Sequence, residues 1–374
     1  MFPQNNIVLI GNSVTEHSKS LLHLKRRVIN IDTFNDSDLL GENYKNSNKY
    51  GYVNQNVVSI LRNLKLNNKD TIIIVTSGYE NNKNYFNILQ KYGIVIGNNL
   101  KTFFNVNCND SLFQSLKKNK IYFPEVLNAS QKINGKFLKK NIYLSGGFGI
   151  KKFNSYSDLI THDKNEYFQK YIRGQVYSIL FISTNNKKFK IIGINKIFSK
   201  KTVFSDYTFS GAVSNVSLND DQLIYLNKVI KFFINEYGLV GINGIDFVVN
   251  KEIFFLEVNP RITQTCYLYE NNFYNGYVCA HINSILNNKL PIIYKKINSY
   301  MYFETLFANT SFFYNYNLSK YNFVSNIPKK NTYIELGEPI CTITVASSKK
   351  SLLNKIMLNN ISLIKNELKD IEII

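Results

Sequence analysis

Apolar residues in the first hundred positions gather into four short continuous runs, which begin at Ile7, Val28, Ile72 and Ile94. Each run has the length of a strand buried on both faces, and segments long enough for helices separate the runs. Such alternation is typical of a parallel sheet covered by helices. The pattern therefore predicts a Rossmann-like domain over residues 1–100.

Beyond this domain the pattern changes to helices and alternating strands. We expect helices over 110–119 and 220–237, and a hairpin whose strands cover 245–249 and 253–258. A closing amphipathic helix is expected over 348–368. The fold class is therefore mixed, with α/β and α+β parts, and the length of 374 residues favours two or three domains.

The hairpin carries a concentrated set of polar side chains. Glu257 and Asn259 are two apart on one strand and face the same side, and Asp246 reaches that side from the paired strand. Two carboxylates and an amide oxygen suit Mg²⁺, and Arg261 follows, placed to neutralise a phosphate or an acyl-phosphate. The alternative for the hairpin alone is an ordinary antiparallel pair with a polar end.

A second segment pairs lysine with glycine. A strand that begins at Phe137 contains Lys139 and Lys140. A loop of small residues follows, formed by Ser145, Gly146, Gly147, Phe148 and Gly149. Glycines let backbone amides approach phosphates closely and lysine adds a positive charge, although such a loop alone is more often a mobile turn.

Together, these motifs resemble the ATP-grasp superfamily, whose members phosphorylate a carboxylate and couple it to an amine or similar nucleophile. The resemblance implies ATP and Mg²⁺ (or Mn²⁺) as cofactors, held by Asp246, Glu257 and Asn259, with Arg261 stabilising the transferred group. It also implies that Lys140 and the glycine loop close over the phosphates. The family's usual Lys-Pro is Lys140-Asn141 here, and Lys139 is a competing assignment.

The segment from Glu166 to Ile182 resembles the hinge that clasps adenine in this superfamily. The resemblance implies a pocket lined by Gln169, Tyr171 and Ile172. Lys196, on the next strand, is expected to contact phosphate. A small-residue loop over 209–212 is expected to touch the acceptor substrate, as is the segment 77–80 at the end of a front-domain strand.

The resemblance divides the chain into a Rossmann-like pre-ATP-grasp domain (1–100), a two-lobed ATP-grasp domain (101–290) and a small C-terminal α+β region packed on the core (291–374). In the last region we expect a strand pair near Tyr333 and 340–344, and a surface that could form a homodimer. The sequence around Gly241 and Phe255 is similar to that of carboxylate–amine ligases, which include the tyramine–glutamate ligases of methanofuran synthesis. Bicarbonate-using carboxylases and non-catalytic Mg-ATP-binding proteins are the alternatives.

Composition narrows the remaining possibilities. The formal charge of +19 comes almost entirely from lysine, with five arginines, as an AT-rich genome would encode, so we expect no nucleic-acid partner. No run is long enough to span a membrane, and four scattered cysteines favour the cytoplasm. His17, His23 and His162 are expected on the surface or in packing, and His281 in the core.

Overall fold

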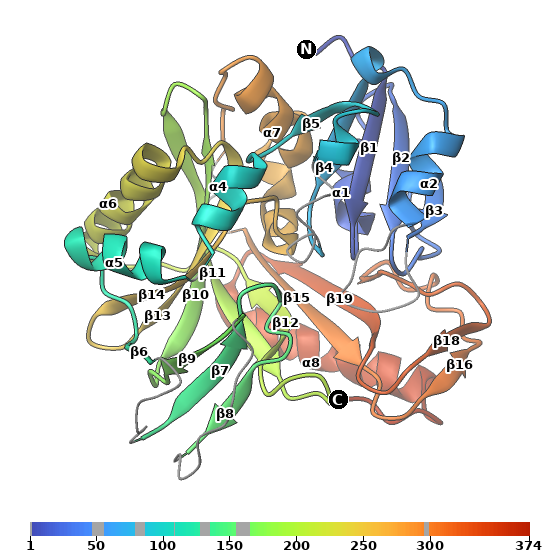
Figure 1. Cartoon of the computed structure of the whole chain (residues 1–374). Coiled ribbons are helices and arrows are strands. Elements are labelled where there is room, and N and C mark those ends of the chain that lie inside the picture. Colours follow the sequence, from blue (N-terminus) through green and yellow to red (C-terminus); the bar gives the residue numbers. More distant parts are fainter. Residues whose placement is uncertain are drawn as a thin grey trace.

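Sheets of five, eight and four strands organise the chain in the computed structural model (Figure 1). The structure describes residues 2–46, 56–78, 87–107, 109–127, 135–154, 165–294 and 299–374. Within this described part, no helix combines the length and apolar character needed to cross a bilayer. Its three cysteines, Cys266, Cys279 and Cys341, are buried and unpaired with one another. Cys108 and His162 lie outside the described residues.

The N-terminal sheet is parallel, as the apolar runs predict. Its order is β3-β2-β1-β4-β5, and its strands are β1 (Asn6–Gly11), β2 (Arg27–Asp32), β3 (Glu42–Lys45), β4 (Thr71–Val75) and β5 (Ile94–Ile96). The helices α1 (Thr15–Lys19) and α2 (Asn56–Asn63) and the turn η1 (Asn68–Asp70) complete the described part of this domain. Helix α1 ends before Leu24, up to which the sequence after β1 predicts helix, and β3 was not predicted because its sequence is polar.

An antiparallel sheet of eight strands forms the centre of the molecule, in the order β14-β13-β10-β11-β12-β15-β19-β17. The strands are β10 (Gln175–Ser183), β11 (Phe189–Lys200), β12 (Thr208–Val213), β13 (Gly241–Val249), β14 (Ile253–Asn259), β15 (Tyr300–Phe307), β17 (Val324–Ser325) and β19 (Pro339–Ser347). Helix α6 (Asp220–Tyr237) packs on one face. The turn η2 (Gln264–Asn272) and helix α7 (Tyr277–Leu286) pack on the other.

A small sheet of four strands projects from this centre (Figure 1, green). Its order is β6-β9-β7-β8, from β6 (Val126–Leu127), β7 (Phe137–Asn141), β8 (Lys151–Phe153) and β9 (Glu166–Lys170). The helices α4 (Leu100–Asn105) and α5 (Asp110–Lys118) precede it along the chain. The cleft described below lies between this sheet and the central one, so these two sheets are the lobes that the sequence predicted.

The C-terminal region shares the central sheet. β15 pairs with β12, and β19 pairs with β15, so the sheet runs without a break past residue 290. The expected strand pair is wrong in its partners. β18 (Thr332–Ile334) pairs with β16 (Phe312–Tyr314), while β19 pairs with β15 and β17. Helix α8 (Lys350–Glu367) closes this core, within two residues of its expected ends.

Buried side-chain amides fix the domains relative to one another. Asn98, just after β5, donates hydrogen bonds to Asn243 Oδ1 (2.7 Å) and to the Pro260 carbonyl (2.9 Å), and accepts one from Val240 N (2.9 Å). Because buried polar groups are costly when unpaired, this network holds the front domain against the hairpin strands in one position.

The core beneath the hairpin can be tested on helix α6. Phe233 is fully buried and stacks on Phe255 of β14 with ring centroids 5.2 Å apart. We expect Phe233→Ala to lower the free energy of unfolding by about 3–5 kcal/mol, because the cavity removes both transfer energy and contacts. Ile224→Ala, on the same helix but 68% exposed, is the control and should cost under about 1 kcal/mol. Chemical denaturation measures both, and equal effects would contradict the packing described.

Candidate active site

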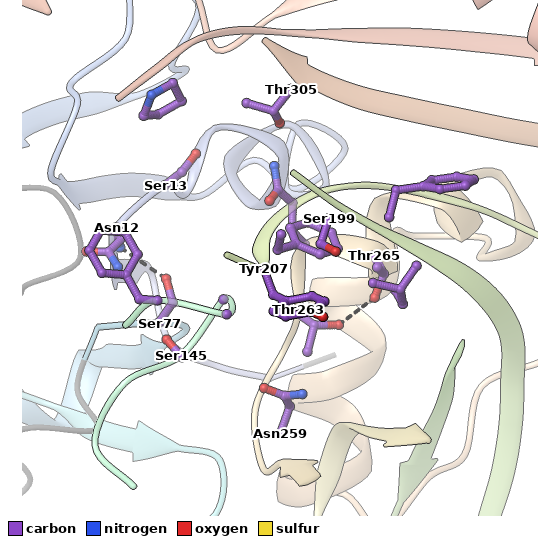
Figure 2. Close-up of a pocket in the computed structure, with 18 of the residues that line it drawn as sticks. Asn12, Ser13, Ser77, Ser145, Ser199, Tyr207, Asn259, Thr263, Thr265 and Thr305 are labelled. Carbon is purple, nitrogen blue, oxygen red and sulfur yellow. Dashed lines mark hydrogen bonds between the residues drawn. The ribbon is translucent and has the colours of Figure 1, made fainter. Parts of the chain in front are cut away.

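A cleft of about 610 Å³ lies where the N-terminal domain, the small sheet, the central sheet and the C-terminal strands meet. Figure 2 shows side chains from these regions around it, including Asn12 and Ser77 from the front domain and Ser145 from the glycine loop. Clefts of this volume hold cofactors and small substrates in other proteins. A smaller pocket of about 50 Å³ adjoins it behind Glu257.

The hairpin brings its polar residues to this cleft as predicted. Asp246 pairs directly with Glu257, and Gly244 pairs with Asn259, with a register shift just beyond Asp246. Asn259 Nδ2 donates to Asp246 Oδ2 at 3.2 Å, and Arg261 Nη2 donates to Asn259 Oδ1 at 3.3 Å. All four side chains line the cleft, so the structure gathers the whole predicted set.

The electrostatics of this cluster fit a divalent cation. Burial, followed by the charge of Glu257, raises the pKa of Asp246 to about 7, although Ser178 and Arg261 act in the opposite direction. A bound cation would offset both causes of that shift. The described residues hold no group of three or more His, Cys, Asp or Glu side chains suited to a metal. Two carboxylates and an amide leave coordination positions open, as suits Mg²⁺ that also binds phosphate oxygens.

The two competing lysines separate clearly. Lys140 is buried on β7 and lines the cleft. Its neighbour Lys139 points to the other side of the strand, where its ammonium lies 2.9 Å from the Glu166 carboxylate in an ion pair. Because successive side chains of a strand alternate between faces, only Lys140 is directed toward a ligand in the cleft.

The glycine loop follows β7 and is pinned to the segment between β11 and β12. Phe209 N donates to the Gly146 carbonyl (2.9 Å), and Ser205 Oγ donates to the Gly147 carbonyl (2.5 Å). Ser145, Gly146 and Gly147 line the cleft, and Gly149 lies at the base of the loop. All three glycines have left-handed backbones, with φ of +65°, +74° and +70°. The loop is therefore held at the border of the cleft by the segment 205–209.

The expected hinge residues also line the cleft. Gln169 is 1% exposed, and its Nε2 has no hydrogen-bond partner among the described residues. Tyr171 and Ile172 continue the same wall. A buried donor without an acceptor is unfavourable, and a ring nitrogen of a purine base could accept the missing hydrogen bond. These residues therefore fit a nucleotide base.

Lys196 is not brought to the cleft, which is a correction of the expected phosphate contact. It pairs with Tyr177, whose ring stacks on Phe247 in the core under α6. Directly paired residues point to the same face of a sheet, so Lys196 lies on the face opposite Asp246. Its ammonium lies 5.1 Å from the Phe198 ring centroid. The alternation of β11 places the neighbouring Ile197 in the cleft instead.

The expected acceptor loop over 209–212 is a strand, since these residues belong to β12. Phe209 lines the cleft from there, whereas Gly211 packs against the backbone of β15. From the other expected acceptor segment, Ser77 lines the cleft, and its Oγ accepts a hydrogen bond from Asn12 N (3.2 Å). Tyr79 and Glu80 lie outside the described residues.

Two buried titratable residues of the front domain line the cleft, where the sequence did not lead us to expect them: His17 was expected on the surface or in packing, and Asp36 was not considered. His17 Nδ1 lies 2.7 Å from the Tyr277 hydroxyl, and burial, followed by the charge of Arg261, lowers its pKa to about 3. Asp36 follows β2, and a carboxylate beyond the carboxyl end of a parallel strand is a signal that could have found it. His281 lies in the core as expected, where its Nδ1 accepts a hydrogen bond from Ile242 N (2.9 Å).

The close approach of the glycine loop provides a test. A Cβ on Gly147 would lie 1.9 Å from the Tyr207 carbonyl oxygen, whereas a Cβ on Gly146 would meet nothing within 4 Å. Both residues have positive φ, so the two alanine variants share the backbone strain and differ in the clash. We expect Gly147→Ala to weaken the hydrogen-exchange protection of residues 145–150 by about 1–3 kcal/mol more than Gly146→Ala does. Equal protection in the two variants would show that the loop does not rest on Tyr207.

Comparison with known proteins agrees with this geometry. The chain is 29% identical over 311 residues to an uncharacterized protein of Methanocaldococcus jannaschii, covering 78% of this chain and 74% of that protein. It is 31% identical over 132 residues to the tyramine–L-glutamate ligase of Methanocaldococcus fervens, covering 35% of this chain and 39% of the ligase. The matched segment is therefore well under half the length of that ligase.

The fold is similar to that of a solved structure, the biotin carboxylase domain of the 2-oxoglutarate carboxylase of Hydrogenobacter thermophilus, crystallised with MgADP and bicarbonate. The TM-score is 0.75 at 13% identity, over 100% of this chain and 91% of that one. Residues 110–265, which contain the lysine, glycine-loop, hinge and hairpin segments, match the family model of the ATP-grasp domain. The match to the ATP-grasp domain therefore covers the segments that form the cleft, and it follows the parallel sheet of the N-terminal domain.

Proposed function

We propose that this protein is an ATP-dependent ligase that activates a substrate carboxylate as an acyl-phosphate and couples it to an amine, releasing ADP and phosphate. One observation carries the proposal. A single cleft joins the two-carboxylate cluster of the hairpin, the lysine and glycine loop of the small sheet, and a polar wall of the front domain. Nucleotide, metal and acceptor substrate thus have places within one volume.

The nucleotide would lie between the small and central sheets. Gln169, Tyr171 and Ile172 would hold the base, and Lys140 would neutralise phosphate charge. The loop from Ser145 to Gly149 would cover the phosphates with backbone N–H groups and exclude water from a reactive acyl-phosphate. Its left-handed glycines allow this approach.

Asp246, Glu257 and Asn259 would hold Mg²⁺ or Mn²⁺, which supplies neutralisation of charge on the transferred phosphoryl group. In the first step the γ-phosphoryl group moves to a carboxylate oxygen of the substrate and ADP leaves. In the second step an amine nitrogen attacks the acyl carbon, the bond to phosphate breaks and the amine loses a proton. Arg261, hydrogen-bonded to Asn259, is positioned to stabilise the negative charge in both steps.

The similarity to a tyramine–L-glutamate ligase supports an amino-acid type of carboxylate and an amine partner. The similarity in fold to a biotin carboxylase domain favours bicarbonate as a second candidate for the carboxylate. Both reactions begin with phosphorylation of a carboxylate oxygen, so the same residues would serve. A Mg-ATP-binding protein without turnover is the third candidate. Operation as a homodimer, without nucleic acid, stays a prediction.

Mg²⁺-dependent ADP release tests the reaction. The assay would combine amino acids, including glutamate, with amines, including tyramine, and would include bicarbonate as a separate arm. We expect release that requires one acid–amine pair, and a loss of about 100-fold or more in Glu257→Gln because the cation loses a charged ligand. Glu252→Gln is the control, since Glu252 is exposed on the turn of the same hairpin.

Each alternative gives a distinct result. Release that needs bicarbonate and no amine would identify the carboxylase reaction. ATP binding without release for any pair would leave a nucleotide-binding protein. Equal activity in Glu257→Gln and Glu252→Gln would overturn the metal assignment, provided that both variants keep the wild-type melting temperature.

A further inference from the structure

We propose that Asp36 anchors a subsite for the ammonium group of the amine-bearing substrate. The inference rests on the proposed function, because it names the place in the cleft where the second substrate of that reaction is held. It predicts the chemical class of that substrate, a primary amine carried on an apolar body.

Asp36 is a buried carboxylate that faces the cleft. It follows β2 at the carboxyl ends of the parallel strands and is 4% exposed, yet it belongs to the cleft lining. Among the described residues, the only hydrogen-bond contact of the Asp36 carboxylate is with Thr15 Oγ1, at 3.5 Å. Hydrogen bonds between oxygens are usually 2.5–3.0 Å long, so this contact is weak. The carboxylate is therefore nearly unpartnered in the described structure.

Neighbouring carboxylates differ because each has a structural role. Asp32 accepts hydrogen bonds from three backbone N–H groups, those of Val14 (2.7 Å), Phe34 (2.8 Å) and Asn35 (2.7 Å). Asp38 accepts from Lys19 Nζ (2.9 Å) and from the backbone N–H groups of Asn326 and Ile327 (3.1 and 2.8 Å). Both are fully engaged in holding loops together. Asp36 lies between them in the sequence, and among the described residues its carboxylate accepts no hydrogen bond from a backbone N–H group or a lysine.

Among the described residues, no ion pair joins Asp36 to a cation. The charge of Lys19 acts to lower the pKa of Asp36, but the Lys19 ammonium is hydrogen-bonded to Glu16 (3.1 Å) and Asp38 (2.9 Å) instead. Burial, followed by the charges of Asp32 and Asp38, raises the pKa of Asp36 well above its usual value. An ammonium ion would bring a positive charge and three N–H donors to this carboxylate, and so would remove the cost of burying it.

The wall near Asp36 indicates what the ammonium is attached to. Cys341 of β19 is buried and lines the cleft close to Asp36, whose charge is the second cause, after burial, that raises the pKa of the thiol to about 12. Ile334, Pro339 and Phe307 line the C-terminal side of the same cleft. These apolar side chains in the same cleft as Asp36 suit a primary amine with an aliphatic or aromatic body.

Direct binding tests the subsite independently of turnover. The probes are tyramine, 2-phenylethylamine and butylamine, with the neutral alcohol 4-(2-hydroxyethyl)phenol as the analogue of tyramine without its charge. Isothermal titration at pH 7 would use wild-type protein and Asp36→Asn, which keeps the shape of the side chain and the Thr15 contact. We expect at least one amine to bind the wild type, the alcohol to bind at least 10-fold more weakly than tyramine, and Asp36→Asn to weaken amine binding about 10- to 100-fold.

Glu338→Gln is the matched control. Glu338 also lines the cleft, but its carboxylate accepts a hydrogen bond from Glu335 N at 2.9 Å and is only partly buried. We expect its amine affinity to stay within 3-fold of the wild type. ATP affinity and melting temperature, measured for both variants, would show that Asp36→Asn has not simply unfolded the front domain.

Several results would overturn the subsite. They are equal amine affinity in Asp36→Asn and the wild type, alcohol affinity equal to that of tyramine, no binding of any of the three amines, and a loss of amine affinity in Glu338→Gln instead. ADP release separates this failure from failure of the proposed function. If ADP release requires an amine and the KM for that amine is the same in Asp36→Asn and the wild type, the ligase proposal stands and the subsite proposal is wrong. Amine binding that depends on Asp36 without ADP release leaves the subsite and removes the ligase.

Discussion

The direct pairing of Asp246 with Glu257 across the β13–β14 hairpin is the constraint on which the rest of the site depends. Two carboxylates are held together in a buried place, which is unfavourable without a cation. The backbone ladder enforces this arrangement, and the core under α6 supports the ladder through Phe233 and Phe255. The protein thus uses the stability of an apolar core to maintain a polar cluster that would otherwise spread apart.

Most of the hairpin, the glycine loop and the hinge could be predicted from the sequence, because each is a local pattern in which neighbours along the chain become neighbours in space. The choice between Lys139 and Lys140 follows from the alternation of side chains along β7, once the ion pair between Lys139 and Glu166 of β9 is known. Lys196 was expected in the cleft but lies on the opposite face of the sheet. The sequence of a largely apolar strand does not reveal which of its faces meets the cleft. His17 and Asp36 could not be placed, because their positions depend on how the front domain docks on the central sheet.

Charged side chains line the cleft from several parts of the fold, including Lys45 of the front domain and the carboxylates of Asp246 and Glu257 on the hairpin. The small sheet and the hairpin end contribute Lys140 and Arg261, which suit phosphate. The front domain contributes the buried carboxylate of Asp36, which suits the opposite charge. Because the domains are fixed together by Asn98 and by the contacts of Asp38 with residues 326–327, these two ends stay at a set separation. In the proposed function, Lys140 and Arg261 would hold phosphate while Asp36 held the amine-bearing substrate.

The continuity of the central sheet past residue 290 has a consequence for how this protein can be divided. β12 is an interior strand only because β15 lies beside it. A fragment that ended near residue 290 would leave the N–H and C=O groups on one side of β12 unpaired, and such an edge invites pairing with other chains. Truncation at this point would therefore favour aggregation, because β15 covers this edge of β12 and also contributes to the wall of the cleft.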